Sequence, residues 1–354
     1  MTGQPLTSLR GLTVIDLSHY LAGSTATVIL ADLGARVIKV ESSGRPDGIR
    51  RQIPRPAGTM RRPVSYQLIR DKEHLDLDLK SAAGRSRLED LVRESDVLVE
   101  NFSAGTLDRL GIGFAWLSSV NPALSLVSIR AFTTGTDLDA IKAGAPSIQA
   151  MTGVDAALGT MDGRPLALGR PTGDMVAGID AALAVVAAWR RARVTGRGGH
   201  VTVGIDRALR QLFVAGMAGQ GRHGAGPTGC PHAFFRCRGH EEWLALSCNS
   251  EAEWRALVAA TVGDRVGNDP RYADRFLRKV NSEALHREFD QWFEGITLAD
   301  AVDRLSGRGV TFMPLLAPER QLTTELFSAA ATIVVRPDDE VGDHPTVRHF
   351  ARVS

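Results

Sequence analysis

The sequence contains little cysteine, few aromatic residues and no excess of charge of one sign. Of 354 residues, only Cys230, Cys237 and Cys248 are cysteines, and this odd, sparse set argues against a disulfide framework and for a reducing compartment. Aromatic residues make up 6% of the chain, so composition offers no clue to a stacked ligand. Lysine and arginine number 42 against 40 aspartates and glutamates, for a formal charge of +2. This balance excludes a histone-like protein or one with an acidic tail.

Segments typical of secretion or of membranes are also missing. The N-terminus lacks a basic region followed by an apolar one, so we expect no signal peptide. The longest apolar stretch, residues 175–189, includes Asp180 and is shorter than the roughly 18 residues of a membrane span. No basic helix with interleaved aromatics is present, as a nucleic-acid-binding protein would show. We therefore expect a cytoplasmic protein with neither a nucleic-acid nor a membrane partner.

Several common catalytic and cofactor motifs do not occur. The first predicted βα turn, SHYLAGSTA, lacks the dinucleotide fingerprint G-x-G-x-x-G, and the sequence has no P-loop, no H-E-x-x-H and no G-x-S-x-G. Histidines and cysteines do gather between residues 223 and 240, which raises the alternative of a zinc site. The seven-residue step from Cys230 to Cys237 matches no compact zinc pattern. We expect no metal there.

The first two hundred residues alternate between strands and helices. Residues 12–17 and 36–41 are short runs rich in β-branched residues, separated by a helical stretch over 22–33 that ends at Gly34. This order predicts a βαβ unit with a right-handed crossover. The pattern recurs, with helices expected over 81–95 and 172–192 and strands over 96–101, 124–132 and 201–205. Such apolar strands predict an α/β fold, a large Rossmann-like domain whose parallel sheet is covered on both faces.

The composition changes after residue 205. We expect a large domain over 1–205, a glycine-rich linker over 206–232, a small α+β domain over 233–325 and a segment over 326–354 that returns to the large domain. A hairpin over 234–248 and helices over 250–260, 281–293 and 298–306 are predicted for the small domain.

Arginines are concentrated in residues 44–63, between two units of the predicted sheet. Six of them, among them Arg45, occur with four prolines and three glycines, a composition typical of a loop. Ligands bind at the carboxyl ends of parallel strands, where Asn101 and Phe102 fall and which Arg109 follows. The arginines are suited to grip phosphates. A solvated surface loop is the alternative.

Asp174 stands near the start of the longest predicted helix, after Thr172 and Gly173. A carboxylate in a first turn stabilises a helix by about 0.3–1 kcal/mol, which alone would explain it. A rigidly held carboxylate flanked by glycines is also suited to act as a nucleophile. The residues alone favour the helix-stabilising role and leave the nucleophile open.

Several motifs together resemble the family III CoA-transferases, the family of formyl-CoA transferase, carnitine CoA-transferase and α-methylacyl-CoA racemase. The matching stretches include ADLGARVIKVE (31–41), VLVENFSAGTLDRLG (97–111), RPTGDMVAGIDAALAVVAAW (170–189) and TGRGGHVTVGI (195–205). The resemblance implies an enzyme that moves CoA from an acyl-CoA to a carboxylic acid through an aspartyl-CoA thioester. It also implies a homodimer whose two chains interlock.

The resemblance implies site residues as well. Asp174 matches the family's nucleophile. The thioester end of the substrate would lie against His19, Tyr20, Leu21, Ala22 and Gly173. Coenzyme A, as co-substrate, would be held by Lys39, Ser42, Arg45, Lys72, Asn101, Phe102 and Arg109.

The sequence also departs from the family pattern. The stretch KAGAPSIQAMTG (142–153) lacks the Tyr-Asp or His-Asp pair that most members carry, and no covering glycine loop is recognisable. The chain stops at Ser354, where the family usually continues. Two alternatives follow: an α-methylacyl-CoA racemase or epimerase with an unidentified second base, and an acyl-CoA-binding homologue that lacks transferase activity.

Overall fold

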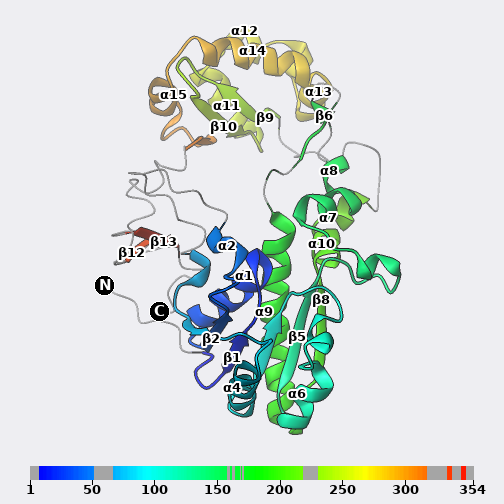
Figure 1. Ribbon diagram of the computed structural model, residues 1–354. Coiled ribbons are helices and arrows are strands. Elements are labelled where there is room, and N and C mark those ends of the chain that lie inside the picture. The colour runs from blue at the N-terminus through cyan, green and yellow to red at the C-terminus, as the bar shows by residue number, and fades with distance from the viewer. Residues whose placement is uncertain are drawn as a thin grey trace. The chain divides into compact units, whose positions relative to one another are not determined.

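Six parallel strands form the central sheet, in the spatial order β3-β2-β1-β4-β5-β8 (Figure 1). This is the order of a Rossmann-like fold, so the predicted α/β class is confirmed. In the computed structural model, the described residues are 8–51, 67–157, 160–161, 164–167, 169, 171–217, 230–316, 333–336 and 344–347. The strands of the sheet are β1 (Thr13–Asp16), β2 (Arg36–Glu41), β3 (Glu73–Asp76), β4 (Val97–Glu100), β5 (Ser125–Arg130) and β8 (His200–Gly204).

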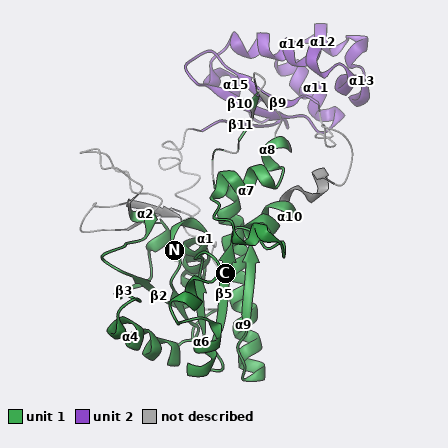
Figure 2. Ribbon diagram, turned by 45° about the vertical axis from the view of Figure 1, so that its right-hand side comes forward, with its two compact units in different colours: residues 1–222, 325–354 green, residues 223–324 purple. Residues whose placement is uncertain are grey.

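The chain is divided into two units, shown in different colours in Figure 2. Unit 1 comprises residues 1–222 and 325–354, and unit 2 comprises residues 223–324. Besides the sheet, unit 1 holds the two-stranded pairs β6 (Thr160–Met161) with β7 (Arg164–Pro165) and β12 (Ile333–Arg336) with β13 (His344–Val347). Its helices are α1 (Tyr20–Asp32), α2 (Gly48–Arg51), α4 (Ala82–Arg93), α5 (Thr106–Arg109), α6 (Phe114–Val120), η1 (Asp137–Ala140), α7 (Ala145–Met151), α8 (Val154–Ala157), α9 (Thr172–Thr195) and α10 (Ile205–Met217).

Both faces of the sheet are buried, because its strands are apolar on both sides. In β4, Val97 and Val99 join the core that contains α1 and α9, whereas Leu98 joins the core that contains α4 and α6. Alternate residues of a strand point to opposite faces, so each strand supplies both cores. The helices therefore cover the sheet from two sides, as the continuous apolar runs predict.

Helix α9 is the longest helix among the described residues. By length and composition alone it could cross a membrane. Of its most apolar 18-residue window, 39% is buried within the structure. Its small residues let it approach α1 closely: a Cβ on Gly178 would lie 2.7 Å from the Ala22 carbonyl oxygen. It ends at Gly196, whose φ of +69° is the left-handed conformation that favours glycine. The helix predicted over 172–192 thus continues for three more residues.

Several elements of unit 1 were not predicted from the sequence, among them strand β3 and helices α7 and α10. Strand β3 is short, and its sequence EHLD lacks a β-branched run, because it is an edge strand and mostly exposed. Helix α7 follows Gly144 with a proline in its first turn, where a proline is tolerated. Helix α10 occupies residues 205–217, most of which were predicted as linker, because Ala208 and Leu209 are buried in the core beside α9. The domain limits proposed from the sequence remain a prediction.

Unit 2 contains an antiparallel sheet of three strands in the order β11-β10-β9. The predicted hairpin is confirmed, since β9 and β10 pair with Leu244 opposite Phe235. Cys230, Cys237 and Cys248 are all free and buried in its apolar core. Its elements are β9 (His232–Arg236), β10 (Trp243–Ser247), α11 (Glu251–Ala260), α12 (Asp264–Gly267), η2 (Pro270–Tyr272), α13 (Arg275–Val280), α14 (Ser282–Glu294), α15 (Leu298–Leu305) and β11 (Thr311–Pro314).

Candidate active site

The sheet has a topological switch point at the carboxyl ends of β1 and β4. These two strands are neighbours, and the chain proceeds from β1 towards β2 and β3 but from β4 towards β5 and β8. Open α/β sheets bind ligands outside the carboxyl ends of their strands at such a switch point. His19 follows β1 there, and Asn101 follows β4.

The two segments at the switch point are joined by the side chain of Asn101. Its Oδ1 accepts a hydrogen bond from the backbone N–H of His19 at 2.8 Å, and its Nδ2 donates to the His19 carbonyl oxygen at 2.6 Å. The His19 ring lies 5.8 Å from the ring of Phe102, centroid to centroid. Burial lowers the pKa of His19, against the raising effect of Asp47. The structure thus brings together three residues that the sequence analysis proposed for the site.

The neighbouring residues of α1 differ in exposure. Tyr20 is 47% exposed and has a φ of +59°, which is uncommon for a residue other than glycine. Leu21 packs against a small buried cluster that contains Val28, whereas Ala22 belongs to the core between the sheet and α9. Tyr20 is therefore the side chain of this turn most open to a ligand, and Ala22 serves the contact between α1 and α9.

Asp174 reaches the same edge of the sheet on α9. Helix α9 ends at Thr195 just before β8 begins, so it runs from the carboxyl edge to the amino edge. Helix α1 starts at the carboxyl edge directly after β1. Gly178 touches the first turns of α1, and Asp174 lies one turn nearer the helix start, about 6 Å along the axis. The acidic residue and the turn around His19 therefore share this edge.

The carboxylate of Asp174 is partly buried. No hydrogen bond or ion pair to it is found within the part of the chain that the structure describes. Burial raises its pKa from 3.8 to about 6. The preceding Gly173 is buried, and a Cβ there would come 2.8 Å from Leu209 of α10. Glycine at 173 lets α9 and α10 meet beside the carboxylate, and it does not itself open a space for substrate.

Lys39 and Lys72 differ from the exposed phosphate contacts that the resemblance implies. Both ammonium groups have no exposed surface. Lys39 Nζ lies 3.1 Å from Asp47 Oδ2, and Lys72 Nζ lies 3.1 Å from Asp16 Oδ2. Burial lowers the pKa of Lys72 to about 8, against the effect of Asp16. In this arrangement both cations are occupied by carboxylates of the chain itself.

The remaining residues proposed for coenzyme A are more accessible. The Arg45 N–H donates to the Ser42 carbonyl oxygen at 2.8 Å in a tight turn after β2. Arg109 is exposed and donates to Thr106 Oγ1 at 2.8 Å. In the arginine-rich segment of residues 44–63, Arg50 Nη2 lies 2.9 Å from Glu41 Oε1. This ion pair leaves less positive charge for a ligand. The side chains of Arg51, Arg55, Arg61 and Arg62 lie outside the described residues.

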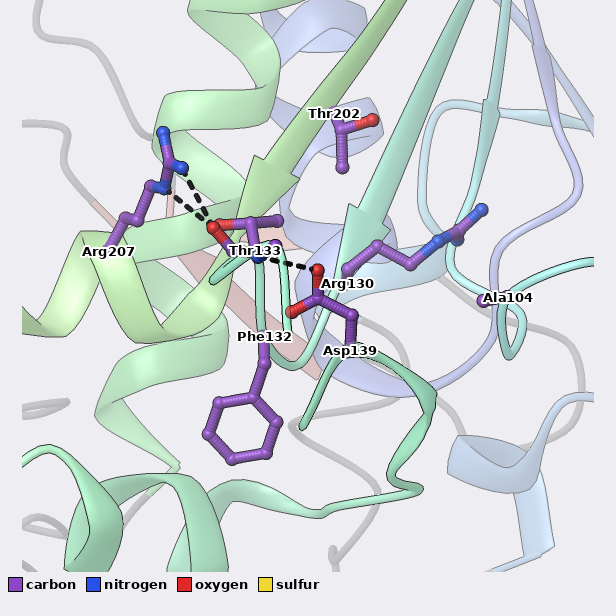
Figure 3. Close-up of a pocket in the computed structure, with 8 residues that line it drawn as sticks. Ala104, Arg130, Phe132, Thr133, Asp139, Thr202 and Arg207 are labelled. Atoms are coloured by element: carbon purple, nitrogen blue, oxygen red, sulfur yellow. Dashed lines mark hydrogen bonds between the residues drawn. The ribbon is translucent and has the colours of Figure 1, made fainter. Parts of the chain in front are cut away.

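A pocket of about 380 Å³ opens at the ends of β5 and β8 (Figure 3). Arg130 and Thr202 belong to the α6 side of the sheet, because their neighbours Ile129 and Val203 face α9. Arg207 donates to the Thr133 carbonyl oxygen at 2.7 Å, and Asp139 lines the same pocket (Figure 3).

The charges of this pocket are largely balanced. Arg130 Nη2 lies 2.7 Å from Glu100 Oε1, and its Nη1 donates to the Phe102 carbonyl oxygen at 2.9 Å. Backbone hydrogen bonding lowers the pKa of Asp139, with a smaller contribution from Arg207. Neither Arg130 nor Arg207 was predicted from the sequence to belong to a site, since each stands in an apolar or mixed stretch with no recognisable motif. The pocket is lined from both sides of the sheet, since Phe132 belongs to the core that contains α9 and Arg207 stands on α10, which packs against α9.

Among the described residues, no three histidine, cysteine, aspartate or glutamate side chains are arranged to hold a metal ion.

The sequence of this chain is similar to those of several known proteins. The family described as CoA-transferase family III matches residues 9–354. The acetyl-CoA:oxalate CoA-transferase of Acetobacter aceti is 30% identical over 322 residues, covering 88% of this chain and 82% of that protein. The formyl-CoA:oxalate CoA-transferase of Streptomyces coelicolor is 28% identical over 363 residues, covering 96% and 88%.

Solved structures show the same fold. A CAIB/BAIF family protein from Brucella suis matches with a TM-score of 0.85 and 24% identity, over 100% of this chain and 93% of that one. The protein Rv3272 from Mycobacterium tuberculosis matches with a TM-score of 0.82 and 24% identity, over 99% and 94%. The sequence match across nearly the whole chain extends the likeness from fold to family. The protein therefore belongs to the family III CoA-transferases and is an enzyme of that family.

Proposed function

We propose that the enzyme moves CoA from an acyl-CoA to a free carboxylic acid, with Asp174 as the nucleophile. The Asp174 carboxylate attacks the thioester carbonyl, the C–S bond breaks, and a mixed anhydride and CoA thiolate form. The thiolate then attacks the aspartyl carbonyl, which releases the donor acid and leaves an aspartyl-CoA thioester. An acceptor carboxylate repeats these two steps in reverse, so covalent catalysis divides one difficult transfer into several easier ones.

The observation that carries this proposal is the position of Asp174. It stands in the first turn of α9, one turn from the contact between Gly178 and Ala22, at the edge that also holds His19. With a pKa of about 6 it is about tenfold more ionised than protonated at pH 7. A partly buried carboxylate without a partner among the described residues is less solvated than a surface one, which favours nucleophilic attack.

The substrates of the relatives suggest which compounds to test first. The names of the similar enzymes pair formyl-CoA or acetyl-CoA with oxalate, and succinyl-CoA with mesaconate. These donors carry short acyl groups, and the acceptors are small dicarboxylic acids. We propose the same substrate class here, with the nucleotide of CoA near Ser42, Arg45, Asn101, Phe102 and Arg109.

Trapping the intermediate tests the mechanism. The protein is incubated with formyl-, acetyl- or succinyl-CoA, and its intact mass is measured before and after treatment with hydroxylamine. A hydroxylamine-sensitive gain of the mass of CoA less one water, absent from Asp174→Asn, is expected. Deuterium exchange at Cα of an α-methylacyl-CoA without this adduct would favour the racemase, and saturable binding with neither reaction would favour an acyl-CoA-binding protein.

We propose an interlocked homodimer in the cytoplasm. Because interlocked chains cannot part without unfolding, light scattering is expected to give twice 38.0 kDa at every dilution. A folded monomer at micromolar concentration would contradict the interlocked assembly.

A further inference from the structure

Four charged side chains are buried together beneath the turn that follows β1. Asp16, Lys39, Asp47 and Lys72 have side chains with no exposed surface. Lys39 Nζ lies 3.1 Å from Asp47 Oδ2 and 3.6 Å from Asp16 Oδ1, and Lys72 Nζ lies 3.1 Å from Asp16 Oδ2. We call these four residues the charge cluster. Two cations and two anions balance within it.

Asp16, Lys39 and Asp47 of the cluster bond the backbone of one turn, Ser18 to Tyr20, whereas Lys72 bonds α1. Asp16 Oδ1 accepts from the Ser18 N–H at 2.9 Å, and Lys39 Nζ donates to the Ser18 carbonyl oxygen. Asp47 Oδ1 accepts from the Tyr20 N–H at 2.7 Å. The backbone of two of the three residues in this turn is thus bonded to a buried charge.

The turn would not keep this shape unaided. Tyr20 has a φ of +59°, where its Cβ crowds the backbone, so surrounding contacts must maintain the conformation. The same Asp47 oxygen also accepts from the Ile49 N–H at 3.0 Å, which fixes the start of α2. Gly48, between Asp47 and Ile49, leaves room for the Tyr20 ring, because a Cβ on residue 48 would lie only 2.3 Å from Tyr20 Cε1.

Stability alone is a poor reason to bury such a cluster. Taking four charges out of water costs much of what their attraction returns, and apolar residues of similar volume often serve as well. The contacts at Ser18 and Tyr20 supply another reason, because they fix the residues on either side of His19. Asn101 holds the His19 backbone itself.

We infer that Lys39 and Asp47 are positioning residues, which hold the turn from Ser18 to Tyr20 in the geometry that CoA transfer requires. The inference rests on the proposed function, since His19 and Tyr20 lie at the edge shared with Asp174. It differs from the role that the resemblance implies for Lys39, which is direct contact with coenzyme A. A phosphate contact and a positioning residue predict different kinetics.

Two matched double variants separate these roles. Lys39→Met with Asp47→Asn removes both charges and keeps an oxygen that can accept from the Tyr20 N–H. Lys39→Met with Asp47→Leu removes the charges and the acceptor together. Both leave the pair of Asp16 and Lys72 balanced. Lys279→Met, a change at an exposed lysine of unit 2, is the control.

Positioning predicts that the Asn variant keeps kcat within about tenfold of the wild type, while the Leu variant loses a further factor of about ten or more. The KM values for acyl-CoA and for the matching acyl-pantetheine should shift together, because the nucleotide is not involved. A KM rise confined to acyl-CoA in both variants would overturn the inference in favour of phosphate contact. Equal, wild-type kcat in two folded variants would overturn it in favour of a purely structural cluster.

Hydrogen exchange supplies a readout that does not depend on activity. The Tyr20 amide is expected to exchange at least about tenfold faster in the Leu variant than in the Asn variant, while amides of α4 stay unchanged. Equal protection in the two variants would overturn the inference even if the wild type proved inactive with every donor tested. Inactivity of the wild type would by itself count only against the proposed function. If the Leu variant does not fold, Asp47→Glu replaces it, because the longer side chain displaces the accepting oxygen.

Discussion

The side chain of Asn101 brackets the backbone of His19, accepting from its N–H at 2.8 Å and donating to its carbonyl oxygen at 2.6 Å. The two residues are 82 positions apart in the chain and meet because β1 and β4 are adjacent. One carboxamide therefore joins the two segments at the switch point of the sheet.

Asn101→Ala is expected to remove both hydrogen bonds and to loosen the turn around His19. At about 0.5–1.5 kcal/mol for each bond, the free energy of unfolding should fall by about 1–3 kcal/mol. Activity should fall by more than this loss of stability explains. Chemical denaturation and steady-state kinetics measure the two effects.

Asn121→Ala is the matched control for that variant. Asn121 also bridges backbone groups, donating to the Val92 and Ser95 carbonyl oxygens at 2.9 and 3.0 Å, but it precedes β5 at the opposite edge of the sheet. It should lose similar stability and keep its kcat. Equal kinetic losses in the two variants would mean that Asn101 acts only through stability.

Asp174→Asn is expected to abolish turnover while acyl-CoA still binds. An amide cannot form the mixed anhydride, so kcat should fall by several orders of magnitude. Calorimetry should give a similar affinity for acyl-CoA. A variant that retained more than about a tenth of the wild-type kcat, a barrier change below about 1.4 kcal/mol, would refute the proposed nucleophile.

The pH dependence follows from the raised pKa of the same residue. Because the carboxylate is the reactive form, turnover should rise with pH through about 6. Between pH 3.8 and about 6 the folded state binds more protons at this site than the unfolded chain, so its contribution to stability falls as pH rises. The stability of Asp174→Asn relative to the wild type should therefore increase over this range, by up to about 3 kcal/mol. Urea titrations at pH 4 and pH 7 test this, and a constant difference would contradict it.

Gly178→Ala is expected to damage the contact between α1 and α9. The added methyl group would lie 2.7 Å from the Ala22 carbonyl oxygen, so the helices must separate. Overpacking of this kind typically costs about 1–3 kcal/mol, and it would also shift Asp174 relative to His19. Gly144→Ala is the control, since the nearest atom to its new Cβ is 4.0 Å away. Thermal denaturation and kcat should change for the first variant and hardly for the second.

Charge reversal at Arg45 or Arg109 tests the proposed binding of CoA phosphates. Each lost charge-assisted contact is worth about 1.5–3 kcal/mol, so the KM for acyl-CoA should rise about tenfold to a hundredfold. The KM for acyl-pantetheine, which lacks the nucleotide, should remain unchanged. A parallel rise for both thioesters would instead indicate a general disturbance of the site.

Much of the fold was predictable because its signals are local. Apolar runs such as residues 36–41 identified the buried strands, and the long apolar stretch after Thr172 identified α9 with Asp174 in its first turn. Strand β3 and helix α10 were missed, since pairing at a sheet edge and packing against α9 define them more than their own composition does.

The sequence by itself determined which charged residues are present and on which elements they occur. It could not determine whether Lys39 and Lys72 face a ligand or an aspartate, because a lysine after an apolar run fits either. Only the tertiary structure brings Asp47 from a loop against Lys39 of β2, and Asn101 from the end of β4 against His19. The physical reason is that a buried charge is stable only beside its counter-charge, and residues far apart in the chain supply that partner once the sheet has formed.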